Sequence, residues 1–246
     1  STTTLQNNIS CFGYSDGSIS LTINGGIPDY TINAAGYSQT LVGGVSSFTT
    51  PSLLPAGTYP YTITDSNNCV YTDSITLISP NQISTTEIIN NVSCNGLSDG
   101  SVVLTINGGT PNYSEDWGLN NSAALSAGSF NYTVTDNNGC VYSDSVVITE
   151  PNLLTTTFTQ TNVSTCSAAD GSINTTIAGG TIPYTYSWNN GSITEDLTNL
   201  SAGTYILTVT DDKGCTAMQS VTITEPPSPT LSYTQIDVSC NGGNDG

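Results

Sequence analysis

The chain has 246 residues with one Lys, no Arg, no His and 19 acidic residues, for a formal net charge of −18. Nucleic-acid binding is excluded because it needs several cationic side chains on phosphates, and an anionic membrane surface would repel this chain. Catalysis by histidine and histidine-ligated zinc are excluded too. Only 8% of the residues are charged, and Thr, Ser, Asn, Gly, Ile, Val and Tyr are common. These residues are typical of strands and turns and not of a disordered acidic tail.

The same motifs return three times in the same order. Asp-Gly-Ser, followed by Ile or Val, begins at Asp16, Asp99 and Asp170, and a fourth Asp-Gly stands at Asp245. Next come Gly-Gly with a nearby Pro, Ala-Gly before an aromatic residue, Thr-Asp with a later Cys, and a closing Pro. We therefore predict tandem repeats within a longer protein. The predicted units are three complete repeats and the start of a fourth: 1–80, 81–151, 152–227 and 228–246.

Each repeat has the pattern of a small all-β domain. Apolar residues alternate with polar ones after Asp-Gly, as at Ile19, Leu21 and Ile23, which is typical of a strand with one buried face. The glycines at the ends of 136–139 and 211–214 favour tight hairpin turns. Short strands in units of about 75 residues predict immunoglobulin-like or fibronectin III-like β-sandwiches, which we expect to form an extended rod. No apolar stretch is long enough to cross a membrane.

The set of motifs resembles the SprB repeat of cell-surface proteins in gliding and related Bacteroidota. The start of the fourth repeat, 238–246 (VSCNGGNDG), fits the beginning of that pattern best. The first repeat departs from it most, with Asn68 where Gly precedes the Cys and Ser79 where Glu precedes the Pro. The resemblance covers essentially the whole chain.

The resemblance implies a structural, non-enzymatic stalk or filament segment of a large secreted adhesin. Such an adhesin would be exported by type IX secretion, associated with the outer membrane and, in gliding cells, moved along the surface. The implied partners are neighbouring repeats of the same chain and, through other regions, surface glycans or the gliding and secretion machinery. No cofactor is expected.

Two other functions stay open at this stage. A carbohydrate-binding immunoglobulin-like module is one, although most Tyr and Trp residues occupy alternating core positions. A glycosidase is the other, using the acid pair 115–116 or 195–196. These pairs stand at different places in their repeats, so we expect no enzyme.

The chain has seven cysteines, of which each complete repeat holds two and the truncated fourth repeat holds one. There is no Cys-x-x-Cys motif, which argues against a zinc site or a thioredoxin-like site. Regularly paired cysteines in a chain of this composition predict disulfides and an extracellular location. The six candidates in complete repeats are Cys11, Cys69, Cys94, Cys140, Cys166 and Cys215.

Two disulfide pairings are open. The first joins the two cysteines of each repeat: Cys11–Cys69, Cys94–Cys140 and Cys166–Cys215. In an immunoglobulin-like topology those two positions lie at opposite ends of the domain, about 20 Å apart, whereas a disulfide needs Cα atoms within about 7 Å. The lower end of one domain does meet the upper end of the next. We therefore favour bridges between neighbouring repeats: Cys11–Cys140 and Cys94–Cys215.

Two further kinds of site are suggested by short patterns. The recurring aspartates begin turns, where Asp commonly caps its own backbone, but a calcium ion shared by Asp99 and Asp211 across a junction is an alternative. The segments 73–75 and 144–146 match the Asp-(Ser/Thr)-aliphatic O-glycosylation sequon of Bacteroidota, which makes Ser74 and Ser145 candidate glycan acceptors. A chance match is the alternative. The third repeat has Gln219 in place of the Asp, so we expect no glycan there.

Overall fold

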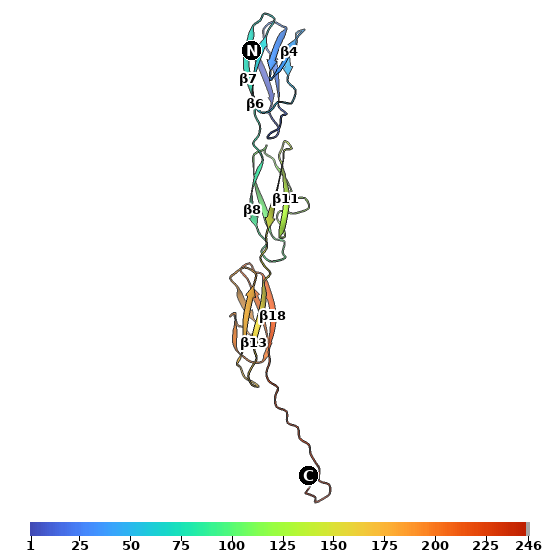
Figure 1. The fold of residues 1–246 in the computed structure, drawn as a ribbon, viewed down its shortest axis with the longest axis vertical. Coiled ribbons are helices and arrows are strands. Elements are labelled where there is room, and N and C mark those ends of the chain that lie inside the picture. Colours follow the sequence, from blue (N-terminus) through green and yellow to red (C-terminus); the bar gives the residue numbers. More distant parts are fainter. Residues whose placement is uncertain (245–246) are drawn as a thin grey trace. The chain divides into compact units, whose positions relative to one another are not determined.

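A computed structural model describes residues 1–244 of the chain; Asp245 and Gly246, the fourth Asp-Gly, lie outside the described residues. The described part holds eighteen strands and no helix. It divides into two compact units, the first made of 1–91 and 98–149, the second of 92–97 and the residues from Glu150 onward. All sheet pairing takes place within the three predicted repeats (Figure 1).

The first repeat consists of two antiparallel sheets. One sheet has three strands, in the order β1 (Thr2–Asn7), β2 (Ser18–Ile23) and β5 (Ser47–Thr49). The other has four, in the order β4 (Tyr37–Leu41), β3 (Tyr30–Ala34), β6 (Gly57–Thr64) and β7 (Val70–Leu77).

The second and third repeats follow the same plan with fewer strands. The second repeat pairs β8 (Ser84–Asn90) with β9 (Ser101–Asn107), and β11 (Gly128–Thr135) with β10 (Ser114–Asp116) and β12 (Val141–Ile148). The third pairs β14 (Gly171–Ala178) with β13 (Thr155–Thr161) and β16 (Leu197–Leu200). Its second sheet pairs β17 (Gly203–Thr210) with β15 (Thr185–Trp188) and β18 (Thr216–Ile223).

This arrangement is the immunoglobulin-like β-sandwich that the sequence predicts. The first two strands of each repeat form one sheet, and the last two join the other sheet. The tyrosine after Ala-Gly adds a local mark of the fold, because its hydroxyl donates to a carbonyl four residues upstream: Tyr59 to Pro55 at 2.7 Å and Tyr205 to Ser201 at 3.0 Å. Among the described residues after Ile223 there is no strand, so the start of the fourth repeat adds nothing to a sandwich.

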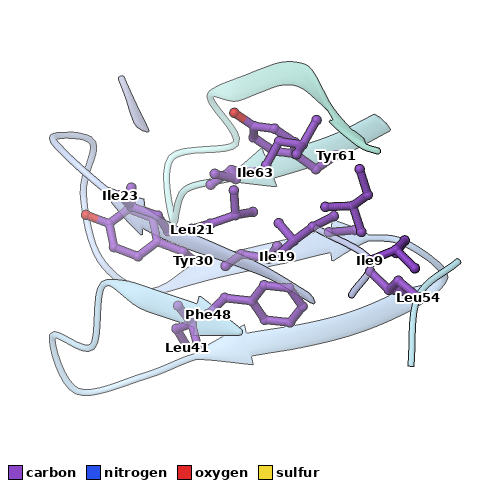
Figure 2. Packing of buried hydrophobic residues seen from close by; sticks show 14 residues of the cluster. Ile9, Ile19, Leu21, Ile23, Tyr30, Leu41, Phe48, Leu54, Tyr61 and Ile63 are labelled. Atoms are coloured by element: carbon purple, nitrogen blue, oxygen red, sulfur yellow. The ribbon is translucent and has the colours of Figure 1, made fainter. Parts of the chain in front are cut away.

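The core of the first repeat lies between its two sheets (Figure 2). Ile19, Leu21 and Ile23 point inward from β2, while Tyr61 and Ile63 come from β6. All five side chains are at least 92% buried. The predicted alternation therefore describes the core face of both strands.

The glycine of Asp-Gly-Ser is required by a close backbone approach. Gly17 and Leu54 exchange two backbone hydrogen bonds, of 3.0 and 3.1 Å. A Cβ atom on Gly17 would lie 2.9 Å from the Leu54 carbonyl oxygen and 2.7 Å from Cδ1 of Ile9. The glycines at 100 and 171 face the same two obstacles, a carbonyl and an aliphatic side chain, in their own repeats. The motif thus marks a close contact between two backbone segments in each repeat.

Two leucines of the first sheet give a matched test of this core. Leu21 is fully buried, whereas Leu5 on β1 is 69% exposed. We expect Leu21→Ala to lower the free energy of unfolding of the first repeat by about 3 kcal/mol through lost burial and a residual cavity. Leu5→Ala should stay within about 0.5 kcal/mol of wild type. Urea unfolding followed by circular dichroism measures both, and equal losses would contradict the assignment of the core.

Candidate functional site: disulfide-linked repeat junctions

A disulfide joins the first repeat to the second within the first compact unit. Cys11 lies in the loop after β1, Cys140 ends the turn between β11 and β12, and their Cα atoms are 5.5 Å apart. Beside the bridge, Nδ2 of Asn138 donates a hydrogen bond of 3.0 Å to the carbonyl oxygen of Ser10. The two repeats are therefore connected here both by the peptide chain and by a side-chain bridge.

A second disulfide has the same form within the second compact unit. Cys94 belongs to the 92–97 loop, Cys215 ends the turn between β17 and β18, and their Cα atoms are 5.6 Å apart. Both disulfides therefore join neighbouring repeats, as the favoured scheme predicts. None of the three pairs within a repeat is formed. In the part of the chain that the structure describes, the remaining cysteines are free and exposed: Cys69, Cys166 and Cys240.

An aspartate carboxylate shapes the turn that carries the second cysteine. Oδ1 of Asp136 accepts from the backbone N–H groups of Asn138 and Cys140, each at 2.9 Å, and Oδ2 accepts from the N–H of Thr110 at 2.7 Å. Burial of Asp136 acts to raise its pKa, but these backbone donors outweigh burial and hold the pKa below its ordinary value. The carboxylate thereby fixes the position of Cys140.

The third repeat builds its turn in the same way. Oδ1 of Asp211 accepts from the backbone of Lys213 and Cys215, each at 2.9 Å, and Oδ2 accepts from the N–H of Thr181 at 2.8 Å. Burial again acts to raise the pKa of Asp211, and the backbone donors lower it further than burial raises it.

A second recurring aspartate shapes the loop that carries the first cysteine. Oδ1 of Asp16 accepts from the N–H of Ser10 at 3.0 Å, and Oδ2 accepts from the Ser10 hydroxyl. Asp170 holds Ser164 through the same pair of bonds, at 3.0 and 2.5 Å. The serine hydroxyl is the main cause of the lowered pKa of both aspartates, followed by the serine N–H. Asp136 and Asp211 therefore cap their own turns as predicted, whereas Asp16 and Asp170 close the first-cysteine loop from its far end and do not begin a turn.

The calcium hypothesis stays a prediction. Asp99 lies in the first unit and Asp211 in the second. Residues 1–244 contain no group of three or more His, Cys, Asp or Glu side chains that could hold a metal ion.

The described residues also include no helix of the length and apolarity that crossing a membrane requires.

The third repeat departs from the others in the position of its first cysteine, a shift that the predicted cysteine pattern did not include. Cys11, Cys94 and Cys240 directly follow the serine of the loop, whereas Thr165 separates Ser164 from Cys166. The thiol of Cys166 donates to the carbonyl oxygen of Pro226, with a distance of 3.3 Å between S and O. Counting from the serine to the aspartate, which are six residues apart in every repeat, reveals this shift in the sequence alone.

Comparison with known proteins identifies the repeat. Segments 3–34, 86–117 and 157–193 match the family described as SprB repeat. The chain carries three SprB repeats. Each matched segment includes the first-cysteine loop, Asp-Gly-Ser and Gly-Gly with its nearby Pro. With its SprB repeats, immunoglobulin-like fold and two disulfides, the chain is an extracellular, adhesin-like repeat module.

Solved structures resemble these SprB repeats at low sequence identity. A Dscam isoform structure is 14% identical, with 87% of this chain and 70% of that chain covered and a TM-score of 0.30. Invasin, a bacterial integrin-binding protein, is 12% identical, with 93% and 61% covered and a TM-score of 0.33. The FN1–FN3 domains of chicken CNTN1 are 10% identical, with 89% and 97% covered and a TM-score of 0.21. Since every TM-score is below 0.5, these similarities say nothing about function. No curated protein matches the chain.

The single lysine allows a direct test of the disulfide pairing. Trypsin, acting in urea after free thiols are blocked, should cut only after Lys213, which lies between Cys94 and Cys215. The nicked protein should run as one molecule on a non-reducing gel and as two fragments after reduction. A Cys166→Ser variant should also stay in one piece, whereas a Cys94→Ser variant should fall apart. The opposite behaviour of the two variants would indicate a bridge between Cys166 and Cys215.

Two adjacent aspartates provide a test of the turn. Asp211 is 6% exposed and bonded to backbone donors, whereas the side chain of Asp212 is 50% exposed. We expect Asp211→Asn to destabilise the third repeat by about 1–3 kcal/mol at pH 7, because the amide replaces a charged acceptor, and Asp212→Asn to stay near wild type.

The effect of Asp211→Asn should depend on pH. The folded-state pKa of Asp211 is lowered, so its carboxylate contributes stability above the unfolded pKa of about 3.9 and loses it as pH falls through the folded pKa. The difference in unfolding free energy between wild type and variant should therefore shrink between pH 5 and pH 2. Denaturant titrations at several pH values measure it, and a difference that is independent of pH would contradict this role.

Proposed function

We propose that the chain is a load-bearing stalk segment of a large secreted bacterial adhesin. The observation that carries the proposal is the disulfide between neighbouring repeats, present at both junctions. A junction with two covalent connections stays joined when either one is cut. Stiff, covalently reinforced spacing is what a stalk needs, and equivalent modules in series supply length.

The acidic pairs support a non-enzymatic role. Oε2 of Glu115 accepts from the indole N–H of Trp117 at 3.1 Å, and Oδ1 of Asp116 accepts from the N–H of Gly118 at 2.8 Å. In the third repeat, Oδ1 of Asp196 accepts from the N–H of Thr175 at 2.8 Å. These carboxylates hold local turns and strands, and they do so at unrelated places in the two repeats.

A carbohydrate-binding module is the less well supported alternative. Trp117 and Trp188, the strongest candidates for stacking on a sugar, are 7% and 3% exposed. Trp117 packs on Tyr132 with ring centroids 4.9 Å apart, and Trp188 packs on Phe158 at 5.7 Å. The indole rings are therefore part of the core, and sugar stacking would fall to scattered tyrosines such as Tyr14.

The finer features of the role are proposals as well. We infer export by type IX secretion, attachment at the outer membrane of a member of the Bacteroidota and, in gliding cells, movement along the surface. Contacts with glycans or with the gliding machinery would involve other regions of the protein. Ser74 and Ser145 are both exposed on the last strand of their repeats, which suits O-glycosylation. Calcium stays the one candidate ion.

Pulling single molecules by their termini tests the load-bearing role. With both bridges intact, the shortest covalent path runs through 1–11, 94–140 and 215–246. The fully stretched oxidised chain should therefore be about one third as long as the reduced chain, because each residue adds at most about 3.6 Å. Equal lengths would show that the bridges carry no load. Binding of the full chain to a glycan array would instead favour the carbohydrate-binding alternative.

A further inference from the structure

The first repeat has an open groove next to a free cysteine. Gly25, Gly26, Cys69, Val70 and Tyr71 line it. Val70 is 62% exposed and Tyr71 is 40% exposed, so an apolar surface faces solvent here. We call this feature the Cys69 groove. At its counterparts in the other two repeats, a chain segment lies on the glycines and the cysteine is in a disulfide.

In the second repeat, the segment between β7 and β8 lies on the corresponding glycines. The N–H of Gly109 donates to the carbonyl oxygen of Asn81 at 2.8 Å. A Cβ atom on Gly108 would lie only 2.0 Å from the carbonyl oxygen of Gln82. Cys140, the counterpart of Cys69, is bonded to Cys11 of the first repeat. The segment between β7 and β8 lies directly on Gly108 and Gly109 and leaves no room for a Cβ atom at either position.

The third repeat repeats this arrangement. The N–H of Gly180 donates to the carbonyl oxygen of Asn152 at 2.8 Å, and a Cβ atom on Gly179 would lie 2.0 Å from the carbonyl oxygen of Leu153. Here too the cysteine beside the groove, Cys215, is in a disulfide. In both repeats, a loop, a linker and a disulfide therefore lie against the glycine pair.

The first repeat has the same glycine pair and the same cysteine turn. Gly25 has φ +87°, close to the +76° of Gly108. The cysteine turn is already formed: Oδ1 of Asp65 accepts from the N–H groups of Asn67 and Cys69, each at 2.9 Å. In the turn at Asp136, whose cysteine is in a disulfide, the two corresponding N–H to Oδ1 distances are also 2.9 Å. The free Cys69 is therefore held in a turn of the same geometry as the turn of the disulfide-bonded Cys140.

We propose that the Cys69 groove is a covalent docking site for the linker and first-cysteine loop of another SprB repeat, placed before the first repeat. The cysteine of that loop would directly follow its serine, as Cys11 and Cys94 do. The site follows from the comparison of three repeats and is independent of any role as a stalk.

The bond forms by oxidation of two thiols. Cys69 and the incoming cysteine lose two electrons and two protons and become a disulfide, while a disulfide oxidant such as oxidised glutathione is reduced to two thiols. The thiolate of one cysteine first attacks the oxidant to give a mixed disulfide, and the second thiolate then displaces the leaving thiol. The oxidising extracellular environment favours the product.

A tandem protein tests the proposal within one chain. Residues 1–229 are placed before a complete copy of 1–246, so that Ser1 of the second copy takes the position of Thr230. Thr230 precedes Ser239 by nine residues, as Ser1 precedes Ser10, which keeps the repeats in register. In the first copy, T165C with C166N restores the Ser-Cys-Asn order of the second repeat. Substitution of Cys69 in the first copy, and of Cys166 and Cys240 in the second, by serine leaves two free thiols.

In a glutathione redox buffer, we expect peptide mapping to join position 165 of the first copy to Cys69 of the second. The equilibrium constant of this bridge against glutathione should lie within tenfold of that of Cys11–Cys140. A matched tandem that keeps Thr165 and Cys166 in the first copy should give a constant at least tenfold lower, because its thiol is one residue out of register. Asp65→Asn in the second copy should also lower it tenfold, with circular dichroism unchanged. Two thiols that stay titratable, or equal constants in the two tandems, would overturn the proposal.

Discussion

The junctions depend on one kind of contact, the acceptance of backbone N–H groups by an aspartate carboxylate. In the cysteine turns, one oxygen of Asp136 or Asp211 accepts two N–H groups of its own turn, and the other oxygen accepts an N–H from the loop after Gly-Gly. A disulfide tolerates only a narrow range of Cα separations, so the cysteine must be held before it can bond. Without the carboxylate, the turn would lose its fixed shape and the bridge its geometry.

This use of acidic residues also explains how several carboxylates stay charged without a cationic partner. Several of its carboxylates are held ionised by backbone or hydroxyl donors, and no cation is needed to pair with them. The described residues contain one ion pair, between Lys213 and the adjacent Asp212, at 3.9 Å and largely exposed. Stability therefore comes from buried sheet faces and hydrogen bonds. With a net charge of −18, the surface repels similar chains. Because the chain has one Lys and no Arg, trypsin finds only one cleavage site in it.

The bridges change what each repeat contributes to the array. In a single domain, a disulfide mainly restricts the unfolded chain, whereas here each bridge connects two separately built sandwiches. Covalent continuity no longer depends on the peptide linker alone. The shifted Cys166 departs from the placement at the other junctions, although its loop aspartate holds the serine in the same way. The cysteine register can therefore vary while the loop itself is retained.

The sequence alone determined the repeat, the strands and the core faces, because alternation of period two and glycine-marked turns act locally. Ile19, Leu21 and Ile23 were identifiable as core residues for that reason. The sequence also suggested two schemes of cysteine pairing, and the distance between the two ends of a domain favoured bridges between neighbouring repeats. Only the tertiary structure decided that Cys11 meets Cys140, 129 residues away, since no local pattern encodes a contact between two domains. It alone showed why Gly108 and Gly179 must be glycines: a neighbouring linker lies where a side chain would stand.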